Sequence, residues 1–253
     1  MSQPVETESW ARYYSRYFQG PALQAAPGIA AFYESTPAGH ENRSLLDIAC
    51  GPGHFAEFFL KRGYDVVGVD LSEHMLQVAR ERTRPFLENG RCRFLRADAT
   101  SFVVEPQVGL ATSLGNLINL LADNDDVRKW FAQTRNAVVN GGTFVFDAHT
   151  RKGFWEGFNG VFVQETEDHL FVLRGIYHGG SDARSWVSGF ERNGDGQWER
   201  FQEKKVLTLV EPSTVLALLH ESGWAGARVT SPTDPTTPLS DPDAHNLILF
   251  VAS

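Results

Sequence analysis

The segment LLDIACGPGHFAEFFLKRGYDVVGVDL, residues 45–71, decides the fold because it reads as one complete β-α-β unit. A short apolar strand leads into the turn Gly51-Pro52-Gly53, residues 55–61 have the apolar spacing of a helix, and a second strand ends at Asp70. Glycine has no Cβ, so backbone N–H groups in such a turn can approach a ligand closely. Asp70 stands where an acid can accept both hydrogen bonds of a ribose diol. The unit therefore predicts a site for a cofactor that contains a nucleoside.

The spacing of the turn leaves two cofactors open. Gly51-x-Gly53-x-x-Ala56 also satisfies the dinucleotide fingerprint, so a nicotinamide-dependent oxidoreductase is one interpretation. Asp47 favours another. A carboxylate just before the turn would repel a pyrophosphate, whereas it would attract a ligand that carries an ammonium or sulfonium charge.

The segment resembles motif I and the acidic loop of class I S-adenosylmethionine-dependent methyltransferases. Three later segments support this resemblance in the right order. Residues 93–99 (RFLRADA) read as a third strand that closes on the family's adenine-contacting position, residues 108–114 precede its cofactor- and substrate-lining loop, and residues 140–147 resemble its Gly-Gly turn and fifth strand. The similarity covers roughly residues 44–150 and resumes near residue 211.

The resemblance implies an α/β, Rossmann-like fold with a mostly parallel, seven-stranded sheet, and S-adenosyl-L-methionine as cofactor. Carried over position by position, the family's pattern assigns cofactor contacts to Tyr14, Asp47, Ala49, Gly51, Gly53, Asp70, Leu71, Met75, Asp98, Ala99 and Leu114.

Turn residues and changes in hydrophobic periodicity along the chain predict three regions. Residues 1–40 carry five aromatic side chains at helical spacing, among them Tyr14 and Tyr17, and are interpreted as a helical lid, although such a stripe also suits simple packing. Residues 41–152 and 211–253 form the cofactor-binding core. Residues 161–209 alternate with period two between Gly- and Asp-rich turns, which predicts an antiparallel cap of about four strands over the substrate site at residues 153–210.

Methyl transfer needs alignment of the reacting groups more than it needs side-chain chemistry, and a base is required only if the acceptor arrives protonated. His149 is the candidate base, because it follows the predicted fifth strand at the edge where open α/β sheets place ligands. His149 could equally be held by loop backbone. The candidate substrate contacts are Tyr17, Asn116, Asn119, Trp155 and His178, with Glu165, Phe158 and Trp186 as further possibilities. His54, at the start of the motif I helix, could hold the methionine carboxylate or be a plain first-turn residue.

The chain is similar to sugar N,N-dimethyltransferases and other natural-product N-methyltransferases. It departs from many of them after the fourth strand, where Gly115-Asn116-Leu117-Ile118-Asn119 replaces an Asp-Ser-Leu-Asn-Tyr type segment. The leading hypothesis is methyl transfer to a nitrogen, or in second place an oxygen, of a small metabolite such as a natural-product intermediate or heterocycle. The alternatives are an NAD(P)-dependent oxidoreductase and a non-catalytic S-adenosylmethionine binder.

Composition limits the partners. A net charge of −8 and a pI near 5.5 give no electrostatic footprint for nucleic acid. No apolar run approaches the roughly 18 residues that cross a bilayer, and the first ten residues do not read as a signal peptide, so a cytoplasmic protein is expected. Cys50 and Cys92 are too few for a disulfide framework, and no spacing of metal ligands is evident. A monomer or a homodimer fits the sequence equally well.

Overall fold

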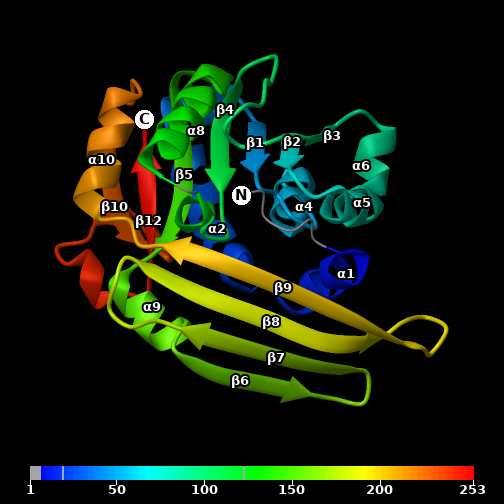
Figure 1. The fold of residues 1–253 in the computed structure, drawn as a ribbon. Helices are drawn as coiled ribbons and strands as arrows, with labels where there is room; N and C mark the ends of the chain where they lie inside the picture. The colour runs from blue at the N-terminus through cyan, green and yellow to red at the C-terminus, as the bar shows by residue number, and fades with distance from the viewer. Residues whose placement is uncertain (1–6, 19, 122) are drawn as a thin grey trace.

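The computed structural model describes residues 7–18, 20–121 and 123–253. Its centre is an eight-stranded sheet in the order β11-β10-β12-β5-β4-β1-β2-β3 (Figure 1). Neighbouring strands from β5 to β3 run parallel, whereas β12, β10 and β11 pair antiparallel at one end. The strands are β1 (Ser44–Ile48), β2 (Asp65–Asp70), β3 (Cys92–Arg96), β4 (Val108–Ser113), β5 (Val138–His149), β10 (Ala227–Ser231), β11 (Asp234–Pro238) and β12 (Leu247–Ala252). This is the Rossmann-like α/β fold that the sequence predicted.

The eighth strand is a correction to the predicted seven. β11 pairs with β10 through only two residue pairs, at Thr230 and Ser231. Its sequence, DPTTP, contains two prolines and reads as a turn. Proline removes a backbone donor, but an edge strand needs only one side of its ladder, so the segment can still pair there.

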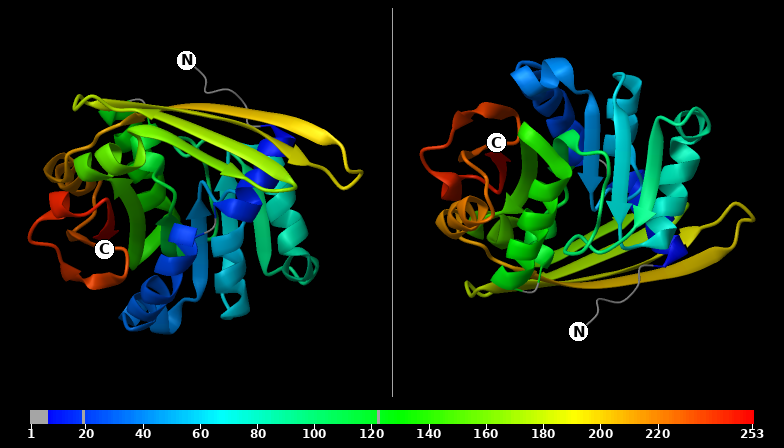
Figure 2. Two further views of the ribbon diagram at one scale, coloured as in Figure 1. Left: turned by 90° about the horizontal axis from the view of Figure 1, so that it is seen from below. Right: turned by 90° about the horizontal axis from the view of Figure 1, so that it is seen from above.

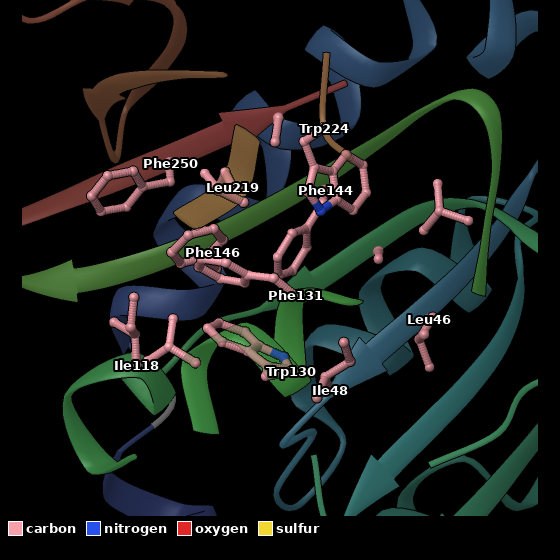
Figure 3. Packing of buried hydrophobic residues seen from close by; sticks show 14 of the residues in the cluster. Leu46, Ile48, Ile118, Trp130, Phe131, Phe144, Phe146, Leu219, Trp224 and Phe250 are labelled. Atoms are coloured by element: carbon pink, nitrogen blue, oxygen red, sulfur yellow. The ribbon is translucent and has the colours of Figure 1, made fainter. Parts of the chain in front are cut away.

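Helices cover both faces of the large sheet (Figure 2). One face carries α8 (Asn124–Ala137) and α10 (Pro212–Glu221), and the other carries α2 (Gly20–Glu34), α4 (His54–Lys61) and α5 (Glu73–Arg82). Figure 3 shows Trp130 and Phe131 of α8 against Phe144 and Phe146 of β5, with ring centroids of Trp130 and Phe146 5.1 Å apart. The remaining helices are α1 (Glu8–Tyr17), α3 (Pro37–Glu41), α6 (Arg84–Glu88), α7 (Leu117–Leu120), α9 (Arg151–Gly157) and the 3-10 turn η1 (Pro242–Ala244).

Between α9 and α10 the chain forms a separate four-stranded antiparallel sheet, here called the cap. Its strands are β6 (Gly160–Glu165), β7 (His169–Ile176), β8 (Asp182–Arg192) and β9 (Trp198–Thr208), in that order across the sheet. Figure 1 shows the arrows of β1 and β4 pointing toward it, so the cap lies beyond the carboxyl ends of the parallel strands. Helix α1 contacts both β9 of the cap and α5 of the core. The cap and α1 therefore stand over the edge where a ligand is expected.

In the described residues, no helix is long and apolar enough to span a membrane. No group of three or more His, Cys, Asp or Glu side chains there has the arrangement of a metal site.

Candidate active site

The glycine turn after β1 is held against the end of β2. Ala49, Gly51 and Gly53 all have positive φ, of 55°, 52° and 76°. The N–H of Gly51 donates to Oδ2 of Asp70 at 2.8 Å, and the N–H of Ser72 donates to Oδ1 of the same carboxylate at 2.8 Å. Asp70 thus fixes the turn at the carboxyl edge of the sheet. The sequence predicts this position for both Asp70 and the glycine turn.

Gly53 permits a close approach of two helices as well as a positive φ. A Cβ added at this position would lie 2.9 Å from the Cβ of Ala79 in α5. We expect Gly53→Ala to lower the free energy of unfolding by about 2 kcal/mol more than Gly63→Ala, because overpacking adds to a similar backbone strain. Gly63 is the matched control, with φ of 93° and open space around its Cβ position. Urea unfolding of both variants measures the difference, and equal losses would show that the Ala79 contact costs nothing.

Asp47 is a buried carboxylate with one oxygen to spare. The hydroxyl of Thr112 donates to Oδ1 at 3.2 Å, while Oδ2 has no partner among the described residues. Burial, together with the smaller effect of the nearby charge of Asp70, raises the pKa of Asp47 to about 7. A buried acceptor without a donor is costly, and a cationic donor would satisfy it. The residues around the turn therefore fit a ligand with an ammonium group beside a ribose, as S-adenosylmethionine has.

Tyr14 of α1 spans the space between the turn and the loop after β4. Its ring comes within 4.0 Å of the position that a Cβ on Gly51 would take, and its hydroxyl within 3.9 Å of the corresponding position on Gly115. The ring also packs at 5.7 Å from Trp10 and stacks on Phe18 at 5.2 Å. The structure thus brings Tyr14, the glycine turn and the loop after β4 together.

Asp147 at the end of β5 anchors that loop, and sequence reasoning missed this role. Its carboxylate accepts hydrogen bonds from the N–H groups of Gly115 at 3.0 Å and Asn116 at 2.6 Å. Asn116 has a left-handed backbone with φ of 55°. Burial raises the pKa of Asp147 to about 6. An acid in an otherwise apolar fifth strand was the signal that could have pointed to it.

Asn119, which the sequence predicts as a substrate contact, is instead hydrogen-bonded to backbone groups. Its Nδ2 donates to the carbonyl oxygens of His149 at 3.3 Å and Thr208 at 2.9 Å, and its Oδ1 accepts from the N–H of His149 at 2.8 Å. The side chain is fully buried. Since its donors and acceptor are engaged with backbone, Asn119 ties α7 to β5 and to the cap, and it presents no group to a substrate.

His149 lies at the carboxyl end of β5, half-buried and with its ring edge toward Phe158 at 5.1 Å. Its Nδ1 lies 3.3 Å from the carbonyl oxygen of Asn246. A carbonyl only accepts, so Nδ1 carries the hydrogen and Nε2 keeps the lone pair. Burial lowers the pKa of His149. The imidazole is therefore neutral near pH 7 and has one nitrogen available as a proton acceptor.

The other predicted cofactor contacts differ in how far they are exposed to solvent. Met75 is buried and its N–H donates to the Ser72 hydroxyl at 3.3 Å, whereas the Leu71 side chain is exposed. Leu114 and Ala99 are half-buried. Asp98 is exposed, and it accepts hydrogen bonds from the N–H and hydroxyl of Thr100, at 2.8 and 2.7 Å.

The predicted substrate contacts fall at opposite ends of the cap. Trp155 is exposed with its ring edge on Tyr177 at 5.1 Å, and exposed His178 follows Tyr177 in the chain. Tyr17 packs 4.4 Å from His169, at the start of β7. The structure therefore does not bring Tyr17 together with Trp155 and His178.

Alternation within the cap separates its two faces. Ser185 and Val187 of β8 are buried toward the core, so Trp186 between them points to the opposite face, away from the substrate edge. Glu165 is exposed in β6. The predicted wall of Trp186 and the role of Glu165 therefore do not match the structure. The inner row instead presents Glu203, which is buried although it is charged.

His54 has a partner within the protein. Its Nε2 lies 2.7 Å from the carbonyl oxygen of Ser15 in α1, and burial lowers its pKa. The ring is thus occupied in joining α4 to α1.

Comparison with known proteins finds similarity to methyltransferases in both sequence and structure. A family model described as a methyltransferase domain matches residues 45–142. The chain is 27% identical over 206 residues to YqeM of Bacillus subtilis, which bears the name of a methyltransferase, covering 78% of this chain and 80% of YqeM. It is similar to the structure of an S-adenosylmethionine-dependent methyltransferase from Clostridium acetobutylicum, with a TM-score of 0.77, 19% identity and 96% of each chain covered. It is also similar to the sugar N-methyltransferase KedS8 from Streptoalloteichus, with a TM-score of 0.74, 20% identity, 100% of this chain and 94% of KedS8.

Proposed function

We propose that this chain, which is a class I S-adenosylmethionine-dependent methyltransferase, transfers the methyl group to a nitrogen atom of a small metabolite. The observation that carries the proposal is the cap, which lies beyond the carboxyl edge of the sheet. Its inner row includes a buried carboxylate, Glu203. An enclosed site suits a small acceptor, and a carboxylate suits an amine. The likeness to a sugar N-methyltransferase supports amino sugars as the first acceptor class to test.

Different side chains would bind different parts of S-adenosylmethionine. Bound S-adenosylmethionine supplies a methyl group on a sulfonium, which an aligned nucleophile can take without covalent help from the protein. In the proposal the spare oxygen of Asp47 holds the ammonium group, Asp70 holds the ribose hydroxyls and Tyr14 covers the site. The cap and α1 exclude water, which strengthens these charged contacts.

An amine acceptor that arrives protonated must lose a proton before its nitrogen can attack. His149 is our candidate for that task, because its neutral ring has a free Nε2 at the carboxyl end of β5. Asn116, on the loop that Asp147 anchors, is our candidate for orienting the acceptor. Trp155 and His178 would then contact only an acceptor long enough to reach their end of the cap.

The other interpretations rank lower. Transfer to oxygen would use the same cofactor site and a deprotonated hydroxyl, so it stays the second candidate. A dinucleotide would bring a pyrophosphate close to Asp47, which the charge of that carboxylate disfavours. A non-catalytic binder would bind cofactor and transfer nothing.

Matched acceptor pairs test the nitrogen assignment. Purified protein with S-adenosylmethionine would be given aminodeoxy sugars and aromatic heterocyclic amines, each beside the analogue that has a hydroxyl in place of the amine. We expect a mass gain of one methyl group in amines and none in their hydroxyl partners, with Asp70→Ala as the inactive control. Methylation of hydroxyl compounds alone would move the assignment to oxygen. Failure of every compound, with cofactor binding intact, would count against small amines.

A further inference from the structure

Helix α1 is held from two sides. On the core side, the Ser15 carbonyl oxygen lies 2.7 Å from Nε2 of His54, and the Ser15 hydroxyl accepts from Nη2 of Arg82 at 2.8 Å. On the cap side, Nη1 of Arg16 donates to Oε1 of Glu191 at 3.0 Å. Successive residues of a helix are about 100° apart, so Ser15 and Arg16 can face different partners while Tyr14 faces the glycine turn.

The cap side of α1 is a mixed aromatic and charged joint. Tyr13 stacks on Phe171 of β7 at 5.1 Å and on Phe201 of β9 at 4.6 Å. His169 and Glu191 face each other as a cross-strand pair of β7 and β8 at the same end of the cap. We call Tyr13, Arg16, His169 and Glu191 the joint.

Three polar atoms of the joint are buried without a hydrogen-bond partner in the part of the chain that the structure describes. They are the Tyr13 hydroxyl, Nε2 of His169 and Oε2 of Glu191. Each such atom costs about 1–3 kcal/mol when it is sealed from water. The Arg16 to Glu191 ion pair offsets part of this cost and ties α1 to the cap.

We propose that Arg16 and Glu191 are positioning residues of the cofactor site, through which the cap holds α1 so that Tyr14 lies across the glycine turn. This inference rests on the cofactor site of the proposed function, but not on the nature of the acceptor. Tyr14 is two residues from Arg16 on the same helix, so a shift of α1 at the joint must move Tyr14 relative to Gly51 and Gly115. An acceptor that changes the cap would thereby change cofactor affinity.

Calorimetric titration with S-adenosylhomocysteine tests the joint without any acceptor. We expect Arg16→Ala and Glu191→Gln each to raise the Kd about fivefold or more, the lower end of typical coupling between sites. Arg128→Ala is the control, because Arg128 forms an exposed ion pair with Glu221 between α8 and α10, at 3.2 Å. It should leave the Kd unchanged. Arg16→Lys keeps the charge and should restore part of the affinity.

A double-mutant cycle separates positioning from a general loss of structure. If the joint acts through Tyr14, Glu191→Gln should have no further effect on the Kd in a Tyr14→Ala background. Additive effects would overturn the inference, as would a wild-type Kd in both joint variants. The Arg16 side chain is 58% exposed, so Arg16→Ala should fold and keep the test decisive. The acceptor assay is separate: normal Kd values in the joint variants leave the proposed function standing.

Discussion

Replacing Asp70 with alanine is expected to weaken S-adenosylhomocysteine binding by about 100-fold or more. In the proposed complex the carboxylate accepts two hydrogen bonds from the ribose hydroxyls, and hydrogen bonds to charged groups are worth about 1.5–3 kcal/mol each. Two such bonds correspond to more than a factor of 100 in Kd. The carboxylate also holds Gly51 and Ser72 by their N–H groups, so its loss should loosen the turn as well. Calorimetric titration at constant pH measures the effect.

Two variants control this experiment. Asp65 is at the other end of β2, 73% exposed and paired with Arg91 at 3.1 Å, so Asp65→Ala should bind as the wild type does. Asp70→Asn keeps the shape and one acceptor oxygen and should lie between the two. A Kd for Asp70→Ala within threefold of the wild type, in a protein that unfolds cooperatively, would show that Asp70 does not hold the ribose.

The cofactor half of the site could be predicted because its residues are close in sequence. The turn, the helix that follows it and Asp70 all lie within residues 45–71, and strand alternation, glycine conformation and helix spacing are local properties. Asp47 could be singled out for the same reason, since its charge and its distance from the turn are both visible in the chain. The fold class followed from this unit and the three segments after it.

The acceptor half depends on pairs that are distant in sequence. Asn119 is engaged with Thr208, 89 residues away, and Asp147 with Gly115, 32 residues away. No periodicity shows such pairs, so the sequence predicts a substrate contact at Asn119 and gives no sign that Asp147 anchors a loop. Alternation in β8 could have assigned Trp186 and its neighbours to opposite faces, but the face that meets the core depends on how the cap is docked.

The pH dependence of cofactor binding should depend on Asp47. Burial raises its pKa from 3.8 to about 7, so in the ligand-free protein the carboxylate is largely protonated below pH 7. The proposed contact with an ammonium group requires the ionised form. Binding well below pH 7 therefore releases close to one proton, and the Kd of S-adenosylhomocysteine should rise about fivefold from pH 7 to pH 6 and approach a tenfold rise per pH unit below that. Above pH 8 it should be constant.

The contribution of Asp47 to the stability of the ligand-free protein should change in the opposite direction to its contribution to binding. A folded-state pKa above the unfolded value means that the folded protein binds more protons between about pH 4 and 7. Asp47 therefore favours the folded state increasingly as the pH falls through this range, and Asp147, with a pKa of about 6, acts in the same direction. Asp47→Asn should bind weakly at every pH, with no slope between pH 5.5 and 7. A slope that persists in Asp47→Asn would assign the titration to another group and remove the ammonium contact from the proposed site.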